Sequence, residues 1–140
     1  MGHISAVIIT RNESLSIGRC IDSMDGVVDD VVVVDSGSSD DTLKIAQSRG
    51  ARVIEPGWLG YGANKNLGNN YATNNWIINL DADEWLSPQL REEIKSLNLD
   101  RNRIYALDRK NLYNGKIIKY GGWSDDWVYR IFDKPKDLQM

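Results

Sequence analysis

Short hydrophobic runs alternate with segments of helical spacing along the first half of the chain. The runs predict strands, at residues 5–10, 30–35, 52–54 and 76–80. Four consecutive valines in the second run are typical of a central strand that is covered on both faces. The intervening segments predict helices, at residues 13–24, about 41–50 and 63–72. This order predicts an α/β fold: a mostly parallel sheet with helices on both faces.

The pattern changes beyond Pro88, where an antiparallel element is expected. Residues 88–97 predict a helix with proline in its first turn, a position that needs no amide donor. Asn114-Gly115 is a two-residue signal for a β-hairpin. The expected strands of this part are residues 103–108 and 116–120 around the hairpin signal, and residues 128–132 at the end.

Polar residues follow three of the predicted strands at the point where each strand ends. They are Thr10-Arg11-Asn12-Glu13, then Asp35-Ser36-Gly37-Ser38, then Asp81-Ala82-Asp83. In open parallel sheets, ligands bind outside the carboxyl ends of the strands, at a point where strand order reverses. We therefore expect the three polar segments to converge on one edge of the sheet.

Composition narrows the classes of function. A length of 140 residues predicts one domain, and a net charge of -3 argues against a nucleic-acid partner. Cys20 has no partner for a disulfide and is expected to be a buried, unreactive thiol in a reducing compartment. His3 is the only histidine, which leaves none for a Ser-His couple or a typical zinc site. Without a signal sequence or an apolar run of about 20 residues, the chain is expected to be cytoplasmic, with any membrane contact peripheral, at the inner face.

Each polar strand end has two interpretations on residue types alone. Asp35 is placed to bind a ribose or base, or to cap its own turn. Asp81 and Asp83 are two residues apart and suit a hard cation such as Mg²⁺ or Mn²⁺, although a polar turn before a helix gives the same pattern. Lys65 and Asn66 lie near a helix start after a glycine-bearing loop, which suits a phosphate but also a solvated lysine.

Ordered motifs spread over nearly the whole chain resemble those of family 2 glycosyltransferases, and the most similar branch is the lipopolysaccharide core glucosyltransferases. The motifs are IITRNE (8–13), VVVVDSGSSD (31–40), GYGANKN (60–66), LDADE (80–84), GGW (121–123) and YRIF (129–132). The resemblance implies a single GT-A domain over residues 1–140. It also implies an inverting, metal-dependent enzyme that transfers a sugar from a nucleoside-diphosphate sugar to a glycan or glycolipid of the cell envelope. A UDP-sugar is the donor expected first.

The resemblance also assigns roles to individual positions. Residues 1–86 would form the nucleotide-sugar half, and residues 87–140 would begin the acceptor half. The residues bordering the nucleotide would be Thr10, Arg11, Asn12, Glu13, Asp35, Lys65, Asn66 and Asp81. Arg11 occupies a position where the family often has an aromatic residue, and its planar guanidinium can also stack on a base. Asp81 and Asp83 would hold the metal, and Trp123 would contact the acceptor.

One departure from the family concerns the general base. Inverting transfer needs a base that deprotonates the acceptor hydroxyl, and the family supplies an acid beyond the YRIF segment. The chain stops before that acid, so it is expected to be a C-terminally truncated form, whose exposed apolar surface would favour self-association. Asp125 and Asp126 are the nearest substitutes, with a solvated loop as the alternative.

Two other classes of function remain open at this point. One is a binding module that holds a nucleotide sugar without turnover, because the base is missing. The other is a nucleotidyltransferase with a similar sheet. That class is expected to show a basic, glycine-rich phosphate loop after the first strand, and Arg11-Asn12-Glu13-Ser14 has no glycine.

Overall fold

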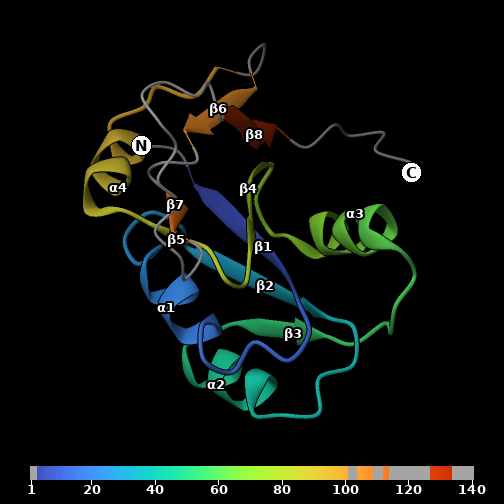
Figure 1. Cartoon of the computed structure of the whole chain (residues 1–140). Coiled ribbons are helices and arrows are strands. Elements are labelled where there is room, and N and C mark those ends of the chain that lie inside the picture. The colour runs from blue at the N-terminus through green and yellow to red at the C-terminus, as the bar shows by residue number, and fades with distance from the viewer. Residues whose placement is uncertain (1–2, 101–103, 109–111, 114–126, 134–140) are drawn as a thin grey trace.

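The computed structural model describes residues 3–100, 104–108, 112–113 and 127–133, and its centre is a six-stranded sheet (Figure 1). In chain order the strands of this sheet are β1 (Ile4–Thr10), β2 (Asp30–Asp35), β3 (Arg52–Ile54), β4 (Trp76–Asp81), β6 (Tyr105–Asp108) and β8 (Trp127–Asp133). Their spatial order is β3-β2-β1-β4-β8-β6. The first four pair in parallel, whereas β8 is antiparallel to β4 and to β6. The predicted α/β class and the antiparallel C-terminal element are both confirmed.

Helices cover both faces of this sheet, as predicted. They are α1 (Ile17–Asp22), α2 (Thr42–Ser48), α3 (Tyr61–Tyr71) and α4 (Pro88–Lys95). In Figure 1, α3 lies on one side of the central strands, and α1 and α4 lie on the other. The buried residues of the described ranges accordingly form two clusters, because successive side chains of a strand point to opposite faces.

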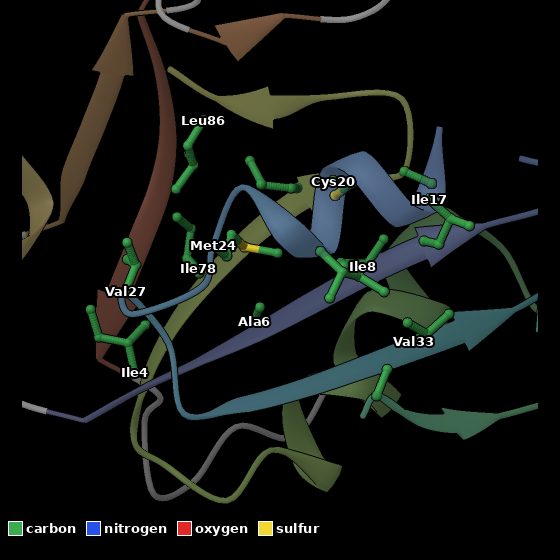
Figure 2. Packing of buried hydrophobic residues seen from close by; sticks show 14 of the residues in the cluster. Ile4, Ala6, Ile8, Ile17, Cys20, Met24, Val27, Val33, Ile78 and Leu86 are labelled. Atoms are coloured by element: carbon green, nitrogen blue, oxygen red, sulfur yellow. The ribbon is translucent and has the colours of Figure 1, made fainter. Parts of the chain in front are cut away.

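The larger cluster joins β1 to α1, α2 and α4. Figure 2 shows Ile8 of β1 beside Cys20 and Met24, which are all fully buried. Figure 2 also shows Leu86 at the same cluster, and this residue belongs to β5 (Trp85–Leu86). The larger cluster therefore fixes α1 and the chain after β4 against the sheet by burial of apolar side chains.

The smaller cluster lies under α3 and contains Val7, Val32 and Val34. The helix approaches the sheet closely at Gly68. A Cβ atom added to this glycine would lie 2.5 Å from Cγ1 of Val7 and 2.7 Å from Cγ2 of Val34. Only a residue without a side chain fits there, so Gly68 sets the distance between α3 and the sheet.

The strand register brings the predicted polar segments to one edge. Thr10 of β1 lies opposite Asp35 of β2, and Ile9 lies opposite Asp81 of β4. The chain order reverses at β1, since β2 and β3 lie on one side of it and β4 on the other. The carboxyl ends of β1 and β4 therefore form the crevice where ligands bind in sheets of this kind.

The first helix is shorter than predicted, and its N-terminal boundary was therefore wrong. Residues 13–16 form a turn, and Leu15 is 96% exposed instead of lying on the apolar face. The amides of Glu13 and Ser14 donate to Thr42 Oγ1 and Asp40 Oδ2, at 2.9 Å and 3.2 Å. Asp40 precedes α2 and Thr42 is the first residue of this helix, so residues 13–16 are held at the sheet edge against the start of α2.

The antiparallel part also differs in detail from the prediction. β5 pairs with β7 (Leu112–Tyr113). This pairing was not predicted, because strands of two residues are too short to show an alternating pattern. The hairpin signal Asn114-Gly115 and the expected strand at 116–120 lie outside the described residues. Within the ranges that the structure describes, no helix combines the length and hydrophobicity needed to cross a membrane.

Candidate functional site

A pocket of about 560 Å³ opens at the carboxyl ends of β1 and β4. Its lining includes five of the predicted site residues, namely Thr10, Arg11, Glu13, Asp81 and Asp83. It also includes residues that were not predicted: Ile9, Ser36, Trp58, Tyr61 and Ala82. The convergence of the β1 and β4 strand ends on one site is therefore confirmed, and the loop before α3 adds a wall to it.

The acids after β4 have two different roles. Glu84 is buried, and its Oε1 accepts from the amide of Asp81 at 2.9 Å, while its own amide donates to the Asp81 carbonyl at 2.9 Å. The thiol of Cys20 donates to the same carbonyl at 3.6 Å. Burial, together with the nearby carboxylates, raises the pKa of this thiol well above its usual range, in agreement with the predicted unreactive cysteine. Glu84 and Cys20 thus fix the turn that presents Asp81 and Asp83.

Asp81 and Asp83 offer two carboxylates to the pocket. One oxygen of Asp81, Oδ1, accepts from the Tyr61 hydroxyl at 2.9 Å. Among the described residues, no hydrogen bond or ion pair engages the half-buried carboxylate of Asp83. Groups of three or more metal-ligating side chains are absent from the described part of the chain. Two hard oxygen donors fit Mg²⁺ or Mn²⁺, which complete their shells with phosphate oxygens and water.

Asp35 caps its own turn in the structure. It is 1% exposed, and its Oδ2 accepts from the amides of Gly37 and Ser38, at 3.0 Å and 2.8 Å. Asn12, in the left-handed region at φ 53°, accepts from the amide of Ser39 at 2.8 Å. Neither residue lines the pocket. Both brace the loop after β2, and the nucleoside-binding role of Asp35 stays a prediction.

The loop before α3 was the main omission from the predicted site. Gly57 and Gly60 have φ of 78° and 109°, which allows the chain to turn sharply on both sides of Trp58. The fully buried Asn64 holds this loop, since its Nδ2 donates to the Gly57 carbonyl and its Oδ1 accepts from the Leu59 amide, both at 3.1 Å. The sequence signal that could have predicted this part of the site is the presence of Trp58 and Tyr61 between glycines.

The remaining predicted residues fall into two groups. Lys65 and Asn66 do not line the pocket, but Lys65 Nζ lies 4.7 Å from the ring centroid of Tyr61, which does. Trp123, Asp125 and Asp126 lie outside the described residues. The roles assigned to these three positions stay predictions.

The sequence of this chain is similar to those of proteins described as glycosyltransferases. An uncharacterized glycosyltransferase of Rickettsia felis is 45% identical over 118 residues, which cover 84% of this chain and 40% of that protein. The lipopolysaccharide core biosynthesis glycosyltransferase LpsC of Rhizobium meliloti is 36% identical over 99 residues, 67% of this chain and 36% of LpsC. The chain thus spans less than half the length of these relatives.

Solved structures share the fold. Glucosyl-3-phosphoglycerate synthase from Mycobacterium tuberculosis, in complex with Mn²⁺, UDP and glucosyl-3-phosphoglycerate, is 31% identical, with a TM-score of 0.53 over 59% of this chain and 34% of that one. TarS of S. aureus superposes with a TM-score of 0.55 over 67% of this chain and 30% of that one, at 24% identity. The sheet and its helices have the GT-A fold.

The match to a protein family covers most of the chain. The family model described as glycosyl transferase family 2 matches residues 5–134, a range that contains every pocket-lining residue named above. The chain belongs to glycosyl transferase family 2.

Proposed function

We propose that this chain is the donor-binding part of an inverting glycosyltransferase that uses a nucleoside-diphosphate sugar and a divalent cation. The observation that carries the proposal is the placement of Asp81 and Asp83 in the same pocket as Arg11 and Thr10, at the point where strand order reverses. The Mn²⁺ and UDP named for the mycobacterial synthase support it.

The pocket offers planar groups for a base and carboxylates for a cation that would hold phosphates. Arg11 and the 61%-exposed Trp58 both line it, and each presents a planar group on which a base can stack. Asp81 and Asp83 lie at the end formed by β4. We assign the base to the side of Arg11 and Trp58, and the diphosphate to the side of the two acids.

Asp81 and Asp83 would hold Mg²⁺ or Mn²⁺ through carboxylate oxygens. When bound, such a cation stabilises the charge that develops on the diphosphate leaving group. The protein's part is to present both carboxylates to the pocket, and the Glu84 and Cys20 contacts contribute by fixing the backbone of the turn at Asp81.

The acceptor side is assigned more broadly. We propose a lipopolysaccharide-core-like or other cell-envelope glycan, supported by the similarity to LpsC. Residues 1–86 would form the donor half and residues 87–140 the start of the acceptor half, with Trp123 at the acceptor. Asp125 and Asp126 are the proposed candidates for the base within this chain.

A panel of nucleoside diphosphates tests this function. We expect UDP with Mn²⁺ to raise the melting temperature more than ADP, GDP or CDP, because a ligand that binds only the folded state stabilises it. UDP with EDTA in place of Mn²⁺ is the matched control and should give a much smaller rise. If no nucleotide raises the melting temperature in the presence of Mn²⁺, the proposal is contradicted.

A further inference from the structure

We infer that Tyr61 is a positioning residue for the metal site, which it serves by holding the Asp81 carboxylate through its hydroxyl. The inference rests on the proposed function, since it assigns Asp81 to the cation and the diphosphate. Tyr61 belongs to the GYGANKN motif, but no role was predicted for it from the sequence. The role inferred here follows from one contact across the pocket.

The contact joins two segments that are distant in sequence. The hydroxyl of Tyr61, the first residue of α3, donates to Asp81 Oδ1 at the end of β4, at a distance of 2.9 Å. Both residues line the pocket. The bond engages one carboxylate oxygen of Asp81 and fixes the rotation of the side chain, which leaves the other oxygen for a cation.

The Asp81 side chain would otherwise be the least constrained part of this turn. Its backbone is held on both sides, by Glu84 Oε1 on the amide and by Cys20 on the carbonyl. Those bonds act on the main chain, whereas the Tyr61 hydroxyl acts on the carboxylate itself. Groups that hydrogen-bond a metal-ligating side chain orient it, and removing one typically lowers metal affinity about 10-fold to 100-fold.

Tyr61 is itself held in place. Lys65, one turn further along α3, places its ammonium 4.7 Å from the centroid of the ring. Asn64 ties the preceding loop to the helix with two hydrogen bonds of 3.1 Å. A side chain that is 46% exposed would normally sample several orientations, so these contacts favour a role that needs a fixed hydroxyl.

The variant Tyr61→Phe removes the hydroxyl and keeps the ring. Mn²⁺ affinity is measured by electron paramagnetic resonance of the free ion at saturating UDP. We expect the dissociation constant for Mn²⁺ to rise about tenfold, the lower end for loss of such a contact because the bond is partly exposed. The melting temperature without ligand should stay near that of the parent chain. If Tyr61 only stabilised the fold, the melting temperature would fall.

Tyr71→Phe is the matched control, because Tyr71 ends the same helix and is 52% exposed. It should leave Mn²⁺ affinity unchanged. Unchanged or tighter Mn²⁺ binding by Tyr61→Phe would overturn the inference, the tighter case meaning that the hydroxyl competes with the cation. If Asp83→Ala also leaves Mn²⁺ binding intact, the proposed function fails as well; if Asp83→Ala abolishes it, only the role of Tyr61 fails.

Discussion

Replacing Asp83 with alanine is expected to abolish the Mn²⁺ dependence of UDP binding. The Asp83 carboxylate lines the pocket and makes no hydrogen bond or ion pair within the described ranges, so its loss leaves the turn intact. Asp81 would remain as the one carboxylate of the pair, already engaged by Tyr61. A cation held by two carboxylates loses half of its protein ligands in this variant.

Isothermal titration calorimetry with UDP, in Mn²⁺ and in EDTA, measures this effect. For Asp83→Ala the two titrations should coincide, at the weak affinity of the parent chain in EDTA. Asp25→Ala is the matched control, since it removes the same charge from an exposed aspartate that lines a different pocket. An affinity in Mn²⁺ equal to that of the parent chain would remove Asp83 from the site.

Replacing Gly68 with alanine is expected to destabilise the fold by about 3 kcal/mol, the upper part of the range for overpacking a core. The added Cβ would lie 2.5 Å and 2.7 Å from methyl groups of Val7 and Val34. These valines are buried, and branching at Cβ restricts their rotamers, so they have little freedom to withdraw. The helix would have to move away from the sheet, and α3 carries Tyr61 at its first position.

Urea unfolding followed by circular dichroism measures the loss. Gly62→Ala is the matched control on the same helix, because nothing lies within 4 Å of an added Cβ there. Alanine is the better helix former, so this control should be neutral or stabilising by up to about 1 kcal/mol. Equal stabilities of the two variants would show that α3 does not pack on the sheet as described.

The strands and their convergence were predictable because they depend on short-range patterns. The valine run of β2 and the short run of β3 match the observed bounds, since β-branched side chains suit a buried, extended backbone. Parallel pairing then forces the ends of β1, β2 and β4 to one edge. The position of Asp81 and Asp83 at the crevice follows from that topology.

The bonding of each acid was not predictable from the sequence. Asp35, Glu84 and Asp83 are all carboxylates near strand ends. The first two accept hydrogen bonds from amides of their own turns, whereas Asp83 makes none within the described ranges and can bind a ligand. The difference depends on side-chain direction within turns of a few residues. Local hydrogen bonds of this kind compete with ligand binding, and residue type alone does not decide between them.

The path of the loop before α3 was equally hidden. Trp58 and Tyr61 reach the pocket because two glycines with positive φ and the buried Asn64 route the chain towards the end of β4. The segment before α1 also depends on distant contacts: the amides of Glu13 and Ser14 donate to Thr42, the first residue of α2, and to Asp40. Both features depend on contacts between segments far apart in sequence.

Paramagnetic broadening of backbone amide signals by Mn²⁺ in the presence of UDP tests whether the cation binds at Asp81 and Asp83. A second region with several acids lies at the opposite edge of the sheet. Asp22, Asp25, Asp29 and Asp30 line it, together with Arg49 and Arg52, which pair with Asp22 and Asp30. We expect Mn²⁺ at substoichiometric concentration to broaden the amide signals of residues 81–84 and 10–13 and to leave those of the second region sharp. Broadening centred on the second region, with residues 81–84 unaffected, would contradict this expectation.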